Sequence, residues 1–168
     1  MNYFDLFELP VQLKVDKSSI GPLFFELSRK YHPDYFVNEG SEAQADALEK
    51  SAMLNKAFKT FQNEDETIKY VLKQKGLLEE EEKYELPPAF LLEVMDINEQ
   101  LMDADDESVA ASLQTSINNL QNEIYEPVQP VIENYKEGIT TEKELLQVKE
   151  YYYKKKYIDR IRREIKGK

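Results

Sequence analysis

The residues with the clearest chemical potential are His32, Pro33 and Asp34, which include the only histidine of the 168-residue chain. A histidine beside an aspartate can serve as a general base, but a hydrolytic site also needs a nucleophile and a substrate pocket. The chain has no cysteine, and no serine stands in a turn suited to a nucleophile. A metal site would need a second histidine or carboxylates at a diagnostic spacing. We therefore expect no catalytic residue, no metal and no cofactor, and an ordinary surface turn is the alternative for these three residues.

The tripeptide is expected to follow the end of a helix. A residue before proline is disfavoured in the α region, so a helix arriving from the N-terminal side should stop near Tyr31 or His32. Pro33 fixes its own φ and offers no N–H, and the aspartate after it favours a turn. Arg29 and Lys30 then lie on the last helical turn, where the helix dipole favours cations. These residues predict a stiff, exposed polar corner with positive charge beside it.

Two amphipathic helices should flank this corner. The first is expected to begin near Ser18, because a start at Asp16 would place Pro22 inside the helix at a cost of about 3 kcal/mol. Its apolar residues recur at helical spacing, at Ile20, Leu23, Phe24, Leu27 and Tyr31. After a loop at 38–40, a capping box of Ser41 and Gln44 opens the second helix, which should run to about Gln62. Its expected apolar positions are Leu48, Ala52, Leu54, Ala57, Phe58 and Phe61.

Shorter elements complete the N-terminal part. Residues 2–9 predict a helix of one or two turns, held by packing and ended before Pro10. A further short helix with four apolar residues should close at Gly76. We expect residues 1–76 to form one helical domain around an antiparallel hairpin.

Charge is unevenly distributed along the chain. The formal net charge is −11, and residues 1–75 carry 12 acidic and 10 basic side chains, whereas residues 76–168 carry 21 and 12. An acidic balance disfavours nucleic acid and anionic membranes, which both need basic surfaces. No run of about 18 apolar residues suggests a spanning helix, and no cationic leader is visible. A soluble, cytoplasmic protein with no nucleic-acid or membrane partner is expected.

The C-terminal part predicts a linker and three helices. Residues 77–87 should form an acidic linker, in which the glutamates 79–82 read as a solvated connector rather than a binding site. The helices are expected at 88–103, from Asp106 or Ser108 to the prolines at 127 and 130, and from a Thr141–Glu144 capping box to about Lys166. Residues 88–168 should therefore form an antiparallel three-helix bundle, and the whole chain an all-α protein.

Tyrosines 151–153 stand beside lysines 154–156. Aromatic rings can stack on bases while lysines hold phosphates, which suggests RNA binding. The acidic balance of this half favours instead a solvated helix face with tyrosines at its edge.

The first 76 residues resemble the J-domain of co-chaperones for DnaK-family chaperones. Residues 3–9 (YFDLFEL) resemble the opening of that family, residues 25–36 (FELSRKYHPDYF) its second helix and loop, and residues 51–58 (SAMLNKAF) its third helix. The resemblance implies that His32, Pro33 and Asp34 contact the chaperone ATPase and that Arg29 and Lys30 attract its acidic surface. Two departures are the interruption by Gly21-Pro22 and Thr67, which stands where the family usually has arginine.

The rest of the chain resembles the HscB family of iron–sulfur co-chaperones. Residues 86–101 (LPPAFLLEVMDINEQL) resemble the start of its C-terminal domain and residues 156–161 (KYIDRI) part of its last helix. The resemblance implies a domain that binds the scaffold IscU and delivers it to a DnaK/HscA-family chaperone. Its scaffold contacts would match Leu91, Leu92, Met95, Asp96, Glu99 and Tyr157.

Helical spacing alone does not assign that surface. Positions 92, 95, 96 and 99 share a face with 91 at its flank, yet leucine and methionine at such spacing usually form a core. Phe90, Val94, Ile97 and Leu101 could supply the core instead. The sequence thus predicts a non-enzymatic co-chaperone with a J-domain (1–76), an acidic linker (77–87) and a scaffold-binding bundle (88–168). The alternatives are a J-domain protein with a different client and a purely structural helical protein.

Overall fold

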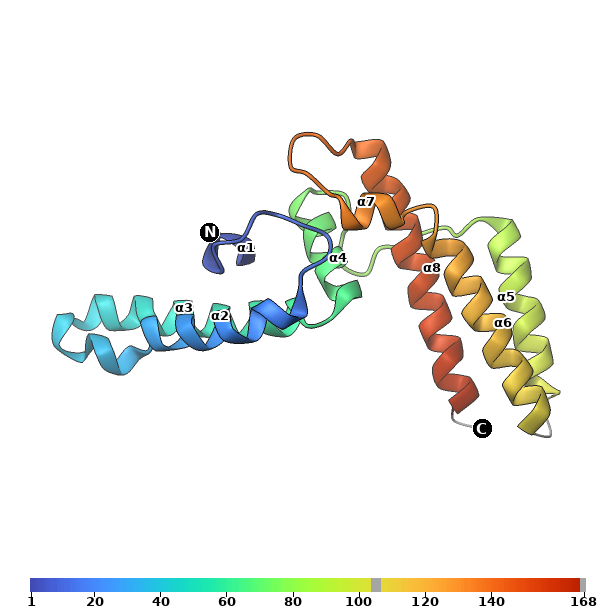
Figure 1. Ribbon diagram of the computed structural model, residues 1–168, viewed down its shortest axis with the longest axis horizontal. Coiled ribbons are helices and arrows are strands. Elements are labelled where there is room, and N and C mark those ends of the chain that lie inside the picture. The colour runs from blue at the N-terminus through green and yellow to red at the C-terminus, as the bar shows by residue number, and fades with distance from the viewer. Residues whose placement is uncertain (104–106, 167–168) are drawn as a thin grey trace. The chain divides into compact units, whose positions relative to one another are not determined.

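The computed structural model describes residues 1–103 and 107–166, and within them the chain is helical with no strand. Contacts divide it into one unit of residues 1–74 and 135–139 and another of residues 75–134 and 140–168. The elements (Figure 1) are α1 (Tyr3–Leu6), α2 (Lys17–Lys30), the 3-10 segment η1 (Pro33–Glu39), α3 (Ser41–Phe61), α4 (Glu64–Gln74), α5 (Pro88–Met102), α6 (Glu107–Tyr125), α7 (Gln129–Glu133) and α8 (Glu142–Lys166). The all-α prediction is confirmed, and the expected start at Asp106 lies outside the described residues.

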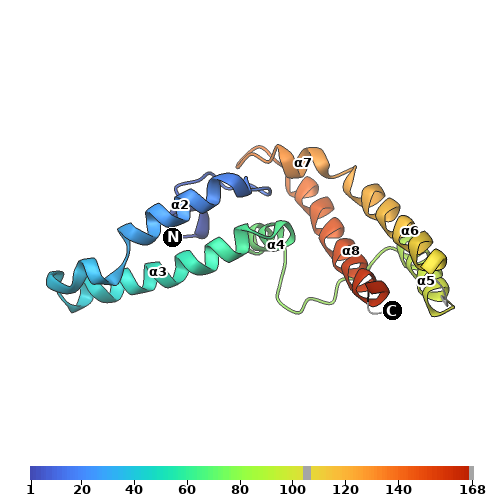
Figure 2. The ribbon, with the colours of Figure 1, turned by 60° about the horizontal axis from the view of Figure 1, so that its bottom comes forward.

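In the first unit, α2 and α3 run side by side and η1 joins them at one end (Figure 2). Aromatic rings hold the elements at the other end of α3. Tyr3 stacks on Tyr70 of α4 with ring centroids 4.3 Å apart, and Phe4 lies 4.9 Å from Phe61. The Tyr70 hydroxyl also accepts a hydrogen bond from the Tyr3 N–H at 2.9 Å. This packing stabilises the four-residue helix α1, which is too short to persist alone.

Helix α2 begins one residue earlier than predicted. Asp16 is its N-cap and accepts hydrogen bonds from the Ser18 N–H at 3.0 Å and the Ser18 hydroxyl at 2.7 Å. These bonds lower the pKa of the Asp16 carboxyl. Pro22 therefore lies inside the helix. The expected start at Ser18 is wrong because capping by Asp16 outweighs the cost of this proline.

Helix α3 also differs from prediction at its start and along one face. Gly40 is the N-cap, with a φ of 101° that favours glycine, and no side chain caps the helix. The predicted Ser41–Gln44 capping box is therefore absent, and residues 38 and 39 belong to η1 rather than to a loop. Leu48 and Ala52 are exposed, whereas the unpredicted Ala47 is buried.

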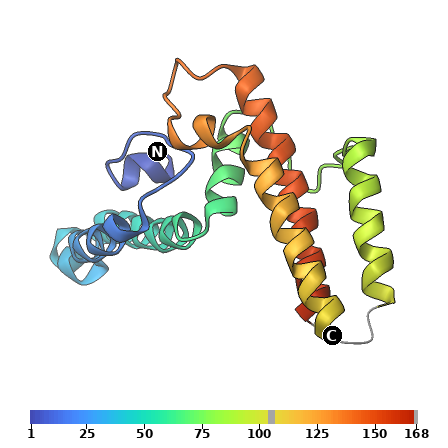
Figure 3. The same ribbon diagram turned by 45° about the vertical axis from the view of Figure 1, so that its right-hand side comes forward.

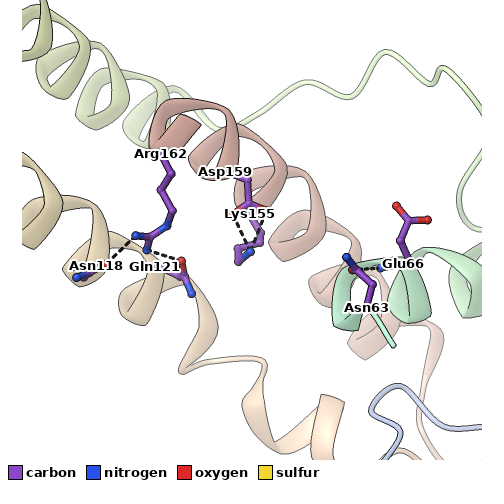
Figure 4. Close-up of polar contacts among 7 residues, drawn as sticks. All are labelled: Asn63, Glu66, Asn118, Gln121, Lys155, Asp159 and Arg162. Atoms are coloured by element: carbon purple, nitrogen blue, oxygen red, sulfur yellow. Dashed lines mark hydrogen bonds and ion pairs between the residues drawn. The ribbon is translucent and has the colours of Figure 1, made fainter. Parts of the chain in front are cut away.

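Helices α5, α6 and α8 form the core of the second unit (Figure 3). Their buried apolar side chains form one cluster, consisting of Phe90, Val94, Ile97, Leu101, Leu113, Ile117, Leu120, Ile158, Ile161 and Ile165. Arg162 of α8 donates to Asn118 at 2.8 Å and to Gln121 at 2.6 Å in α6 (Figure 4). Apolar burial and this polar pair together hold α6 against α8.

The ends of α6 and α8 follow the predicted signals. Helix α6 ends at Tyr125, and Pro127 and Pro130 flank the start of the short α7. At the start of α8, the Glu144 N–H donates to the Thr141 hydroxyl at 3.1 Å, and the Thr141 N–H donates to the Glu144 carboxylate at 3.0 Å. The predicted capping box is therefore present.

The segment before α5 packs on α8 instead of being a fully solvated connector. Glu82 pairs with Lys149 at 2.6 Å, and Tyr84 stacks on Tyr153 with ring centroids 4.5 Å apart. The bond to Lys149 lowers the pKa of the Glu82 carboxyl, and burial raises the pKa of the Tyr84 hydroxyl. The interpretation of residues 79–82 as solvated fails at Glu82, although its neighbours 79–81 are exposed.

The tyrosine–lysine run of α8 likewise differs from the predicted solvated face. Tyr151 and Tyr152 are buried, and Tyr153 is engaged by Tyr84. Lys154 lies over the ring of Phe90, with its Nζ 5.5 Å from the centroid. The rings of this run therefore take part in packing.

Candidate functional site

The His32–Asp34 corner is exposed at the end of the α2–α3 hairpin. Helix α2 ends at Lys30 with Tyr31 as its C-cap, as the following proline dictates. The His32 side chain is 54% exposed. The Asp34 N–H donates to His32 Nδ1 at 3.2 Å, which leaves Nε2 as the ring nitrogen able to donate to a partner.

Further backbone bonds make this corner rigid. The Tyr35 N–H donates to the His32 carbonyl at 3.1 Å, and η1 continues without a break to Glu39. The Tyr35 ring meets the imidazole edge-on, with centroids 6.1 Å apart. Because these bonds are local, the corner holds its shape without being buried and keeps its polar groups toward solvent.

Basic side chains lie next to the His32–Asp34 corner, at the end of α2 as predicted. Arg29 and Lys30 are both exposed on the last turn of α2. Lys30 Nζ lies 5.4 Å from the centroid of the Tyr31 ring, and Lys50 of α3 lies at the same distance. Lys30 and Lys50 thus share one aromatic ring next to His32.

Thr67 stands where the J-domain family usually has arginine, but it is buried and offers no basic side chain to a partner. Its side chain is 1% exposed, and its hydroxyl donates to the carbonyls of Asn63 at 2.9 Å and Thr60 at 3.1 Å. It therefore joins the end of α3 to α4 from within, near the turn where Asn63 accepts from the Glu66 N–H (Figure 4).

Helix α5 presents a second candidate surface, and the core shows which stripe faces outward. Phe90, Val94, Ile97 and Leu101 all point into the bundle. On the opposite side Leu92 is 66% exposed and Met95 56% exposed, large fractions for residues of this size. The exposed carboxylates on the same face are Asp96 and Glu99.

Leu91 and Tyr157 lie at the margin of that surface. Both are half-buried, and Tyr157 packs against the core cluster while Arg160 lies 5.3 Å from its ring centroid. Helices α5 and α8 contact each other. Four of the six predicted residues therefore lie together on the outward face of α5. The other two, Leu91 and Tyr157, are partly buried by packing within the unit.

Sequence reasoning missed other exposed apolar side chains. Phe25 on α2, Tyr35 on η1 and Met102 at the end of α5 are all exposed. Phe25 could have been found, because it lies four residues before Arg29 and off the buried stripe. Met102 lies seven residues after Met95 and so falls on the same side of α5.

In residues 1–103 and 107–166, no group of three or more histidine or carboxylate side chains is arranged to hold a metal ion. None of the helices described there is long and apolar enough to cross a membrane.

A helical hairpin that presents His32, Pro33 and Asp34 at its tip, in one chain with a three-helix bundle, is the architecture of a J-domain co-chaperone. Residues 86–166 match the family described as the HSCB C-terminal oligomerisation domain. The HscB co-chaperone homologue of Photobacterium profundum is 29% identical over 98% of this chain and 95% of its own length. That of Vibrio vulnificus is 32% identical over 71% of this chain and 73% of its own length.

Solved structures agree with these sequence relatives. The chaperone HscB from Vibrio cholerae superposes with a TM-score of 0.72 at 26% identity, over 99% of this chain and 96% of that one. Human co-chaperone HscB gives 0.78 at 26% identity, over 99% and 81% of the two chains. The chain belongs to the HscB co-chaperone family.

Proposed function

We propose that this chain stimulates the ATPase of a DnaK/HscA-family chaperone and delivers an IscU-type iron–sulfur scaffold to it in the cytoplasm. The chain itself hydrolyses nothing. Residues 1–76 would act on the chaperone, and residues 88–168 would hold the scaffold. The observation that carries the proposal is the coexistence of two exposed, chemically different surfaces on a chain of the HscB family.

The first contact would be made by His32, Pro33 and Asp34. The corner is exposed and held by its own backbone bonds, so it can bind a partner without losing much conformational freedom. Arg29 and Lys30 would steer the encounter with an acidic chaperone surface, because exposed charges act mainly on association rate.

The second contact would be made by Leu91, Leu92, Met95, Asp96, Glu99 and Tyr157. Apolar side chains bordered by carboxylates suit an interface with a dry centre and a polar rim. A separate stripe of α5 residues fills the core of the bundle, and Leu92 and Met95 are not among them but exposed. This arrangement supports the proposed role.

A steady-state ATPase assay of the purified chaperone tests the first contact. We expect the chain to raise the rate, and His32→Gln to abolish the increase with an unchanged melting temperature. Equal stimulation by His32→Gln would contradict the assignment of the corner. A pull-down with the scaffold tests the second contact, and binding of another client instead would identify a J-domain co-chaperone with different cargo.

A further inference from the structure

A groove of about 430 Å³ lies in the second unit between the start of α5, the end of α6 and the first half of α8. Its floor is apolar and includes the buried side chains of Phe90, Leu120 and Val128, with half-buried Ile124 beside them. The volume falls within the range of sites that bind small ligands or peptide side chains. No role proposed above uses these residues.

The rim of the groove is acidic. Glu93 of α5, Glu123 of α6 and Glu150 of α8 line it together with one cation, Lys154. Lys154 lies 3.7 Å from the Glu150 carboxylate and over the Phe90 ring. Exposed Glu93 and Glu123 have no partner among the residues that the structure describes. An occupant with its own positive charge would therefore find two unneutralised carboxylates above an apolar floor.

Lys154 shows how a cation is held at this place. Its ammonium group contacts both a carboxylate and an aromatic face, a combination that stabilises lysine and arginine side chains. The Glu93 and Glu123 carboxylates can hold a lysine or arginine in the same way by charge, while Ile124 offers apolar contact.

The groove adjoins the outward face of α5. Ala89 and Glu93 line the groove, and they lie three residues before Leu92 and Asp96 respectively. Residues three apart are neighbours on a helix surface. A protein bound to Leu92 and Met95 could thus place a further segment in the groove at a high effective concentration.

We propose that this groove is a second contact for the iron–sulfur scaffold, which inserts a segment with one large apolar side chain flanked by lysine or arginine. The inference rests on the proposed scaffold-binding function and extends it to a site on a different side of α5. The groove would add affinity through its floor and select for basic segments through its rim.

The decisive test fills the groove from the wall that lies away from α5. Gln147 of α8 is exposed and lines the groove, whereas the adjacent Leu146 is exposed and does not line it. We expect Gln147→Trp to weaken scaffold binding about tenfold in calorimetric titrations with the purified scaffold. The matched control Leu146→Trp should keep the affinity within about twofold, and both variants should stimulate the chaperone ATPase normally.

Two charge-reversing variants of α6 test the acidic rim of the groove. Glu123→Lys should weaken scaffold binding about fivefold at low salt and flatten its salt dependence, because a screened attraction has been removed. Glu107→Lys, at the opposite end of α6, changes the net charge equally and should have little effect.

The outcomes separate this inference from the proposed function. If Leu92→Ala with Met95→Ala abolishes binding but Gln147→Trp and Glu123→Lys leave it unchanged, the groove is no scaffold contact and the proposed function stands. If Leu92→Ala with Met95→Ala binds normally, the α5 face is no scaffold contact and the groove cannot be a second one. If the unmodified chain binds no scaffold, the proposed function itself fails. If Glu123→Lys instead dissociates a dimer seen by light scattering, with scaffold affinity unchanged, a second copy occupies the groove and the inference is overturned.

Discussion

The His32–Asp34 corner and the outward face of α5 are both exposed, but they differ in what holds them and what they offer. The corner is polar and is fixed by local bonds such as that from the Asp34 N–H to His32 Nδ1. The α5 face offers apolar area at Leu92 and Met95, and its position depends on the core packed beneath it.

Under the proposed function, the two surfaces would bind their partners through different interactions. A small rigid corner can set a hydrogen-bonded register and contributes little area. An apolar face binds through burial, at roughly 25 cal/mol for each Å² removed from water. Substitutions should therefore affect one surface without the other, and stability should respond to the core of α5 rather than to its outward side.

The largest expected effect compares two residues of α5. Ile97 is 7% exposed and packs in the core, whereas Met95 is 56% exposed. We expect Ile97→Ala to lower the free energy of unfolding by about 2 to 5 kcal/mol and Met95→Ala by less than about 0.5 kcal/mol. Urea denaturation followed by circular dichroism measures both. Similar losses for the two variants would show that the face is part of the core.

The next largest expected effect is on the stability of the fold, through the Glu82–Lys149 ion pair in the segment before α5. Lys149 lowers the pKa of Glu82 below its ordinary 4.5, so the pair stabilises the fold at pH values above 4.5. That stability is lost as the pH falls through the lowered pKa. We expect Glu82→Gln to cost about 1 kcal/mol near pH 7, with the difference from wild type shrinking in acid.

The matched control for Glu82→Gln is Glu85→Gln in the same segment, where the side chain is exposed. Thermal unfolding at several pH values compares the two variants. A pH-independent difference for Glu82→Gln would show that packing, not the ion pair with Lys149, holds the segment.

The smallest effect should be seen beside the corner. Arg29→Ala with Lys30→Ala should slow association with the chaperone a few-fold at low salt and leave the maximal ATPase stimulation unchanged. Lys17→Ala, at the opposite end of α2, is the control. If maximal stimulation falls instead, these residues act on the bound chaperone rather than on encounter.

Local signals in the sequence predicted much of the fold. Pro33 ended α2 and the Thr141–Glu144 box began α8, because each signal depends on near neighbours. The errors arose where two local rules competed. At α2, the cap at Asp16 outweighed the cost of Pro22, and at α3 Gly40 took the cap position that Ser41 had been expected to hold.

The two candidate sites also differ in how far the sequence could predict them. The exposure of His32 follows from its own turn, so the sequence could predict it. The outward direction of Leu92 and Met95 depends on which side of α5 meets α6 and α8, and helical spacing allowed either choice. The contacts of Glu82 and Tyr84 with α8 join residues about 70 positions apart, and no local rule reaches that far.

The central claim is that the two surfaces act separately, and a crossed measurement with chaperone and scaffold together tests it most directly. ATPase stimulation and scaffold affinity would be measured for His32→Gln and for Leu92→Ala with Met95→Ala. The account predicts that His32→Gln loses stimulation and keeps the scaffold affinity. The Leu92–Met95 variant should keep basal stimulation and lose both the affinity and the further increase caused by scaffold. If either variant impaired both activities while remaining folded, the claim would be contradicted.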